Sequence, residues 1–177
     1  MELILWHSMK IELSKPFFVE TITIIGVGLI GGSLAQALKR AKAAGTVVCY
    51  DKNEDALNNA LSMGVADSVE NDLIAAVKNS DIIVLATPIT MMGEIARIIF
   101  PHLKEKAILT DVGSTKGSVI NAIGQALGYL PARFVPAHPI AGTEKHGVEN
   151  SFASLFENRR VLITPHIENN HEAVTII

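Results

Sequence analysis

The sequence predicts a doubly wound α/β fold with a mostly parallel sheet. Three observations support this fold class. Short β-branched runs alternate with longer amphipathic stretches, which is the pattern of βαβ units. Several of the short runs are continuously apolar, as strands are when helices cover both faces of a sheet. The 177 residues are 49% hydrophobic and 19% charged, so one domain with a sizeable core is expected and disorder, coiled coil and collagen are excluded.

The predicted elements alternate along the chain after a lead-in over residues 1–20. This lead-in lacks the charge pattern of a signal peptide, because Glu2 lies where positive charge is required. Strands are predicted at residues 21–25, 46–50, 81–85, 107–110, 133–137 and 160–164. Helices are predicted at about residues 29–42, 54–63, 72–78, 90–100 and 114–127. Residues 21–165 therefore form one domain, and residues 166–177 a tail or the start of a linker.

Charge and cysteine content exclude several classes of partner. Fifteen Lys and Arg residues against eighteen Asp and Glu give a net charge of -3, so no basic field attracts nucleic acid. The single cysteine, Cys49, excludes a disulfide framework and a multi-cysteine zinc site, and no metal site is predicted. It also fits a reducing compartment, so a cytoplasmic location is expected. Residues 21–38 carry no charge, but their glycines, threonines and Gln36 do not suit a membrane span.

The first predicted strand runs directly into a glycine-rich turn and a helix, in the sequence Gly-Val-Gly-Leu-Ile-Gly over residues 26–31. In a dinucleotide-binding turn, Gly26 allows the tight bend, Gly28 lets the backbone approach a pyrophosphate, and Gly31 lets the helix pack against the strand. Leu29 and Ile30 then begin the helix, whose N-terminal N–H groups attract phosphate. The alternative is an ordinary glycine-rich turn of an α/β protein.

Asp51 follows the second predicted strand, 25 residues after Gly26. An acid at this point accepts hydrogen bonds from the adenosine ribose hydroxyls and repels a 2′-phosphate, which favours NAD over NADP. A helix cap or a surface aspartate is the alternative, and Lys52 leaves some NADP binding open. The sequence contains neither a G-x-x-x-x-G-K-[ST] phosphate loop nor a Tyr-x-x-x-Lys pair. These absences indicate a Rossmann-type dehydrogenase with a different base.

His138 is the candidate base, because it directly follows the strand predicted at residues 133–137. Doubly wound folds bind ligands at the carboxyl ends of their strands. A neutral imidazole there can accept the proton of a substrate hydroxyl. The alternative is a hydrogen-bonded structural histidine. Of the other histidines, His102 follows Pro101, and the remainder include three in ends without predicted structure: His7, His166 and His171.

Two further turns follow predicted strands. Ser114 and Thr115 lie after the strand at residues 107–110, where either hydroxyl is able to cap the next helix and Ser114 is also able to orient an imidazole. Thr87 and Pro88 follow the strand at residues 81–85. They are predicted to line the nicotinamide side of a bound cofactor, or only to begin the next helix with an early proline.

Three segments together resemble the prephenate dehydrogenase family, including its arogenate-using relatives. They are Gly-x-Gly-Leu-Ile-Gly-Gly-Ser-Leu-Ala at residues 26–35, Asp-Val-Gly-Ser-Thr-Lys at 111–116, and His-Pro-Ile-Ala-Gly-Thr-Glu-Lys-His-Gly at 138–147. The resemblance covers about residues 22–165. It implies NAD-dependent oxidation of C4 of prephenate with loss of the ring carboxylate as CO2, giving 4-hydroxyphenylpyruvate for tyrosine biosynthesis.

The resemblance also implies roles for individual residues. His138 would hydrogen-bond the C4 hydroxyl as base, and Ser114 would hold both that imidazole and the substrate. Thr143 and Glu144 would lie beside the substrate. His146 stands where many relatives have serine, which puts the contacts of that loop in doubt. Family members continue into a helical dimerisation domain that this chain lacks, so a homodimer is expected only of a full-length member and the fragment alone is expected to be poorly active.

The alternatives differ in substrate or in class. Arogenate is an alternative small-molecule substrate, because the contact that discriminates it from prephenate lies in the absent domain. A β-hydroxyacid-type oxidoreductase on the same fold is a second, although that class relies on a lysine in the following helical domain. A stand-alone NAD-binding module is the non-enzymatic alternative.

Overall fold

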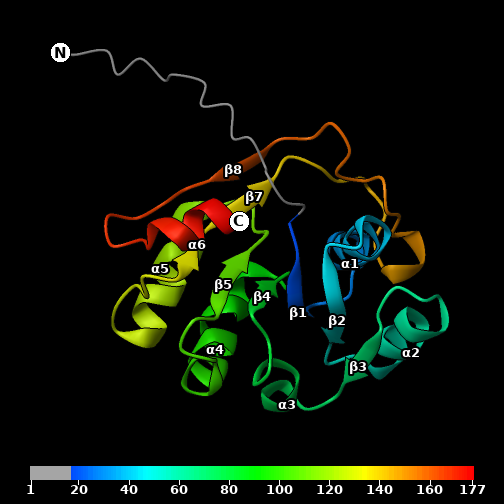
Figure 1. The fold of residues 1–177 in the computed structure, drawn as a ribbon, viewed down its shortest axis with the longest axis horizontal. Helices are drawn as coiled ribbons and strands as arrows, with labels where there is room; N and C mark the ends of the chain where they lie inside the picture. The colour runs from blue at the N-terminus through cyan, green and yellow to red at the C-terminus, as the bar shows by residue number, and fades with distance from the viewer. Residues whose placement is uncertain (1–16) are drawn as a thin grey trace.

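The computed structural model describes residues 17–177 (Figure 1). Most of the predicted lead-in, with His7, lies outside the described residues. The first strand, β1, begins at Val19, inside the range predicted for the lead-in. Six parallel strands form one sheet in the order β3-β2-β1-β4-β5-β6, which is the order of doubly wound dinucleotide-binding folds. The strands are β1 (Val19–Ile25), β2 (Ala44–Tyr50), β3 (Ser68–Glu70), β4 (Ile82–Leu85), β5 (Ile108–Asp111) and β6 (Phe134–Val135).

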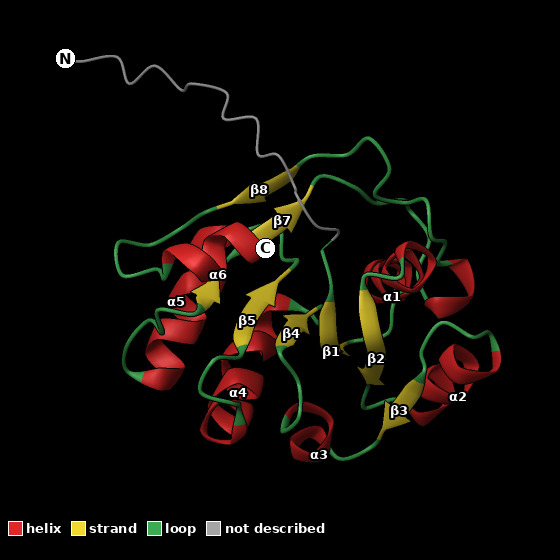
Figure 2. Cartoon of the chain, in the orientation of Figure 1, coloured by secondary structure: helices red, strands yellow, loops and turns green. Residues whose placement is uncertain are grey.

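Helices connect the strands and cover both faces of the sheet (Figures 1 and 2). They are α1 (Leu29–Ala41), α2 (Glu54–Ser62), α3 (Leu73–Val77), α4 (Ile89–Ile99), the short 3-10 turn η1 (Phe100–His102) and α5 (Lys116–Leu127). Helices α1, α2, α4 and α5 each follow the strand that the sequence placed before them, whereas α3 follows β3, a strand that was not predicted. Within residues 17–177, no helix is both long enough and apolar enough to cross a membrane.

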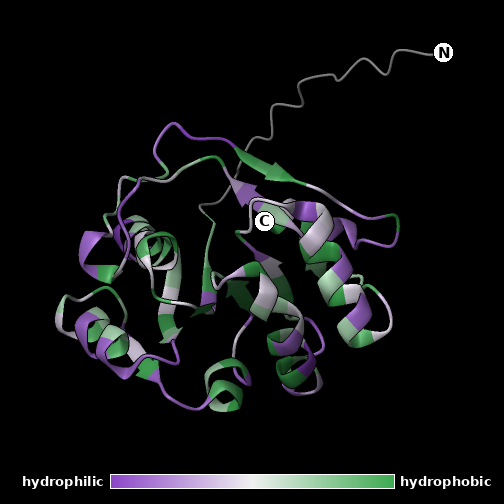
Figure 3. Cartoon of the chain, turned by 180° about the vertical axis from the view of Figure 1, so that it is seen from behind, coloured by the Kyte–Doolittle hydropathy of each residue, from purple (hydrophilic) through white to green (hydrophobic). Residues whose placement is uncertain are grey.

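The core has two layers because successive strand residues point to opposite faces of the sheet. Ile24 and Val84 pack on one face with side chains of α1 and α2, whereas Ile25 and Leu85 pack on the other with side chains of α3, α4 and α5. In Figure 3 the strands are mostly green between helices that alternate green and purple. Burial on both faces explains why these strands are continuously apolar in the sequence.

Beyond the six-stranded sheet, the chain forms a separate ribbon of β7 (Ala137–Pro139) and β8 (Val161–Ile163), which pair antiparallel. The strand predicted at residues 133–137 is therefore wrong as one element: it is divided between β6 and β7 at Pro136. Proline has no N–H to continue the ladder, so the chain leaves the sheet at this residue. His138 lies inside β7, whereas the sequence placed it after a strand. The loop between β7 and β8 contains the 3-10 turn η2 (Val148–Asn150).

The tail predicted at residues 166–177 packs back onto the domain. Its helix α6 (His171–Ile176) lies beside β6, and Ala173 is fully buried. The backbone N–H of Asn170 donates to the Ala132 carbonyl at 2.7 Å, and the Asn169 side chain donates to the Phe134 carbonyl, also at 2.7 Å. The expectation that His171 lies in an unstructured end is therefore wrong, because it begins a capped helix.

Candidate active site

The glycine turn between β1 and α1 has the geometry that close backbone approach requires. Gly26 has φ +102°, a conformation that side chains rarely adopt. A Cβ on Gly31 would overlap the Gly26 carbonyl oxygen and meet the Ile24 side chain at 3.1 Å, so only glycine lets α1 pack this closely. A Cβ on Gly28 would meet nothing within 4 Å among the described residues, so this part of the turn faces open space.

Asp51 directly follows β2 and faces the glycine turn. One carboxylate oxygen accepts the Val27 N–H at 2.8 Å, and the other accepts the Asn53 N–H at 3.0 Å. The alternative role of helix cap belongs instead to Asn53, whose side chain accepts N–H groups of the first turn of α2. Two backbone donors thus fix the Asp51 carboxylate at the mouth of the turn.

A cleft of about 530 Å³ opens beside this turn, and its lining includes Gly26, Gly28, Asp51, Thr87 and Pro88. Thr87 follows β4, and its buried hydroxyl has no hydrogen-bond partner within residues 17–177. Buried hydroxyls are normally paired, so an unpaired hydroxyl beside the cleft is unusual. Pro88 also precedes the first residue of α4, so both of its predicted roles are compatible. The cleft lies between β1 and β4, where the strand order reverses direction.

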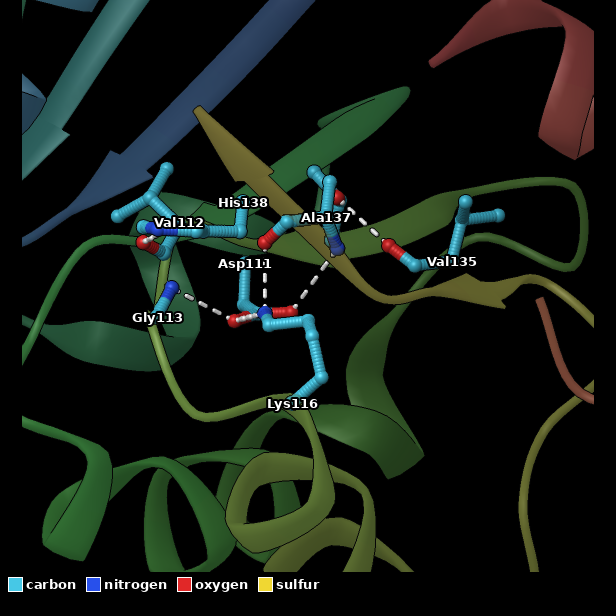
Figure 4. A network of polar contacts seen from close by, with 8 residues as sticks. Asp111, Val112, Gly113, Lys116, Val135, Ala137 and His138 are labelled. Carbon is cyan, nitrogen blue, oxygen red and sulfur yellow. Dashed lines mark hydrogen bonds and ion pairs between the residues drawn. The ribbon is translucent and has the colours of Figure 1, made fainter. Parts of the chain in front are cut away.

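His138 lies on the β5 side of the same sheet edge and is half-buried. Its Nδ1 is 3.3 Å from the Val112 carbonyl oxygen (Figure 4). A carbonyl only accepts, so in this hydrogen bond the Nδ1–H donates. In the neutral ring the Nε2 atom then keeps its lone pair, which is the state that a general base requires.

Beside His138, Asp111 and Lys116 form a buried ion pair (Figure 4). The Asp111 side chain is fully buried and that of Lys116 is 13% exposed. Asp111 also accepts the N–H groups of Gly113 at 2.8 Å and Ala137 at 3.3 Å, and the Lys116 ammonium donates to the Ala137 carbonyl at 2.6 Å. Burial raises the pKa of Asp111 and lowers the pKa of Lys116, although each partner opposes the shift of the other.

Ser114, Thr143 and Glu144 are exposed. Within the described residues no hydrogen bond joins Ser114 to His138, whose ring partner is the Val112 carbonyl. Thr115 precedes α5 but makes no side-chain capping bond in the described part of the chain, so the predicted cap by Ser114 or Thr115 is wrong. The Thr143 hydroxyl accepts the Lys145 N–H at 3.1 Å.

The loop that carries Thr143 and Glu144 continues along the chain to contact α1. The Phe152 N–H donates to the Ser33 hydroxyl at 3.0 Å, and the Gln36 amide donates to the Ser151 hydroxyl at 2.7 Å. The loop between β7 and β8 therefore contacts the helix that follows the glycine turn.

A family model described as the nucleotide-binding domain of prephenate dehydrogenase matches residues 34–177. The chain belongs to this family. The match starts within α1, so the glycine turn lies just before it. A cyclohexadienyl dehydrogenase of Zymomonas mobilis is 39% identical over 157 residues, which cover 88% of this chain and 53% of that protein.

Two solved structures of this family superpose well on the chain. Prephenate dehydrogenase from A. aeolicus, in complex with hydroxyphenyl propionate and NAD+, is 35% identical with a TM-score of 0.83, covering 92% of this chain and 56% of that one. Arogenate dehydrogenase from Synechocystis is 29% identical with a TM-score of 0.79, covering 88% and 53%. The chain thus spans about half the length of these prephenate dehydrogenase relatives.

Asp111 and Lys116 were not among the residues predicted for the site. The predicted strand ended at residue 110, which left Asp111 in a loop, whereas β5 includes it. An acid that ends a buried strand, followed five residues later by a lysine, was the available signal. Nothing in the sequence indicated that both side chains reach Ala137.

Within residues 17–177 no group of three His, Cys, Asp or Glu side chains is arranged to hold a metal ion.

Proposed function

We propose that this chain is the cofactor-binding and catalytic-histidine half of an NAD-dependent prephenate dehydrogenase. The observation that carries the proposal is the position of two groups at one sheet edge: an open glycine turn with its acid after β1 and β2, and a histidine with a free Nε2 after β5 and β6. The family membership and the NAD+ named for the A. aeolicus relative support the same conclusion.

The residues of the cleft suit a dinucleotide. Gly26, Gly28 and Gly31, with the start of α1 at Leu29 and Ile30, leave backbone N–H groups open to a pyrophosphate. Asp51 would accept the ribose hydroxyls, and the unpaired Thr87 hydroxyl with Pro88 would line the nicotinamide end. Bound NAD would supply the ring that accepts hydride.

In this proposal His138 Nε2 accepts the proton of the substrate C4 hydroxyl as C4 loses hydride. The bond between the ring and its carboxylate breaks, CO2 leaves, and its electron pair completes the aromatic ring as a phenolate. The proton held on His138 then returns to the phenolate oxygen, which gives 4-hydroxyphenylpyruvate and restores the neutral imidazole. The Val112 carbonyl holds the Nδ1–H and so keeps Nε2 available. Ser114, Thr143 and Glu144 would contact the substrate. Because these three side chains are exposed, they are accessible to a ligand that arrives from solvent.

Arogenate is the second candidate substrate, since one family relative is an arogenate dehydrogenase. The placement of the chain in tyrosine biosynthesis follows from either substrate. Assembly as a homodimer in the full-length enzyme remains a prediction of the family resemblance, and a cytoplasmic location remains a prediction of the cysteine content.

Calorimetric titration of the chain with NAD and NADP tests the cofactor half of this proposal. We expect saturable NAD binding that is tighter than NADP binding. Asp51→Ala should weaken NAD binding about tenfold to hundredfold, because hydrogen bonds to a charged group are worth about 1.5–3 kcal/mol. Asp55→Ala, an exposed acid in the first turn of α2, is the matched control and should leave the NAD dissociation constant unchanged. Undetectable binding of both nucleotides to a folded sample would contradict the proposal.

The catalytic half is tested in the complete enzyme. His138→Asn should abolish turnover of prephenate while NAD affinity is retained, because the change removes the base but no group of the cleft. Retained turnover would remove His138 from the mechanism.

A further inference from the structure

The Asp111–Lys116 pair binds both backbone polar groups of Ala137, the residue that precedes His138. The Ala137 N–H donates to one Asp111 oxygen at 3.3 Å, and the Ala137 carbonyl accepts from Lys116 at 2.6 Å (Figure 4). The other Asp111 oxygen accepts both the Lys116 ammonium and the Gly113 N–H. Two charged side chains from β5 and α5 thus hold a single peptide segment of β7.

These side-chain bonds replace the sheet ladder that Pro136 interrupts. Up to Val135 the chain pairs with β5 through backbone hydrogen bonds, and the Thr110 hydroxyl donates to the Val135 carbonyl at 2.7 Å. Pro136 has no N–H, and beyond it the chain pairs with β8 rather than with β5. Asp111 and Lys116 therefore supply two polar links that keep the start of β7 against the carboxyl end of β5.

The hydrogen bond between His138 and Val112 spans the same two segments. Val112 follows Asp111 directly, and His138 follows Ala137 directly. A displacement of β7 relative to β5 would separate the imidazole Nδ1 from the Val112 carbonyl oxygen, which are already 3.3 Å apart. The neutral ring would then be free to place its hydrogen on Nε2, where it blocks proton acceptance.

Stability alone does not explain a pair buried to this degree. Desolvation of two charges costs several kcal/mol, and a buried ion pair is often replaceable by apolar side chains without loss of stability. Such a pair instead fixes geometry, because each charged group must keep all of its hydrogen bonds. We propose that Asp111 and Lys116 are positioning residues that keep His138 in the Nδ1–H tautomer and so keep Nε2 free to act as a base. The importance of His138 rests on the proposed function.

Nitrogen NMR of the imidazole rings in the 177-residue chain tests this proposal. The His138 signal is assigned by its disappearance in His138→Asn. We expect the Nδ1–H tautomer in the wild-type chain and a loss of that tautomer in Asp111→Leu/Lys116→Met, which removes both charges together. Lys104→Met is the matched control: it removes the exposed ion pair with Asp81 and should leave the His138 signals unchanged.

Two results would overturn the proposal. One is the Nε2–H tautomer in the wild-type chain, and the other is an unchanged His138 tautomer in a folded double variant. If the double variant does not fold, Lys116→Met alone replaces it. Burial already raises the pKa of Asp111, so that residue can take up a proton and still accept the Gly113 and Ala137 N–H groups. Failure of NAD to bind would contradict the proposed function but not the tautomer result, so the two failures are distinguishable.

Discussion

The two halves of the candidate site are built from different interactions. The glycine half, from β1 to β2, is formed by backbone conformation and close packing: a turn at φ +102°, a helix that touches the strand at Gly31, and one acid. The histidine half, from β5 to β7, is formed by side chains that bind backbone atoms about 25 residues away in the sequence: Thr110 to Val135, and Asp111 and Lys116 to Ala137. The first half depends mainly on backbone conformation, with one carboxylate that reaches the turn from 24 residues away, whereas the second depends on side chains that hold backbone atoms of another strand.

We therefore expect substitution of Gly31 to lower the stability of the domain and substitution of Gly28 to lower its NAD affinity. The loss of stability at Gly31 should be the largest effect. Gly31→Ala would place a Cβ against the Gly26 carbonyl and should destabilise the domain by about 3 kcal/mol, the upper end of ordinary overpacking. Gly28→Ala meets open space, so it should leave the free energy of unfolding nearly unchanged but weaken NAD binding. Urea denaturation and NAD calorimetry measure both quantities. Equal stability losses for the two variants would remove the distinction.

In the histidine half, substitution of a buried side chain should lower the stability of the domain without changing its NAD affinity. Thr110→Val removes the hydroxyl that donates to the Val135 carbonyl and leaves that acceptor unpaired, which should cost about 1–2 kcal/mol. NAD affinity should be unchanged, because Thr110 does not line the glycine cleft. Thr175→Val, at an exposed position on α6, is the control and should change stability by less than about 0.5 kcal/mol. A loss of NAD affinity in Thr110→Val would show that the halves are not separate.

The smallest effect concerns an exposed ion pair at the opposite sheet edge, which contrasts with the buried Asp111–Lys116 pair. Burial alone would raise the pKa of Asp81, but hydrogen bonds from Lys104 and the Thr21 N–H outweigh it and hold the pKa below its usual value. A carboxyl with a lowered pKa stabilises the fold above its unfolded-state pKa, and this contribution is lost as the pH falls through the lower folded-state value.

Asp81→Asn should therefore destabilise the domain at pH 7 by only about 0.5 kcal/mol, since solvent screens a pair that is over a third exposed. Its effect should shrink below the usual aspartate pKa. Chemical denaturation at several pH values measures this. A loss that stays constant down to strongly acidic pH would mean that the Asp81 charge is not its source.

Most of the fold was predictable from the sequence because most helices and strands carry local sequence signals. The five predicted helices and the strands at β1, β2, β4 and β5 lie within two residues of their expected bounds, since apolar runs and glycines mark them. The three-residue strand β3 was missed because Ser-Val-Glu has no apolar run. The division at Pro136 was missed because Pro136 lies in an otherwise strand-like sequence, and only the fold shows that β7 turns to pair with β8.

The sequence indicated only part of the candidate site, and the roles of its residues stay predictions. The acid after β2 and the glycines follow from spacing, and His138 follows from its place near a strand end. The partner of the His138 ring did not, because a backbone carbonyl at Val112 has no sequence signature. In the sequence, Asp111 lies at a strand end and Lys116 at a helix start. Their common contact with Ala137 forms only when β6 pairs with β5.

In the proposed function, the glycine half binds NAD in a domain that also positions His138. Amide NMR of the 177-residue chain during titration with NAD tests it most directly. We predict saturable shifts at residues 26–31, at Asp51 and at Thr87, with smaller changes at the far sheet edge around Asp81. A folded chain whose amide spectrum shows no saturable change in the glycine turn would contradict NAD binding at this site.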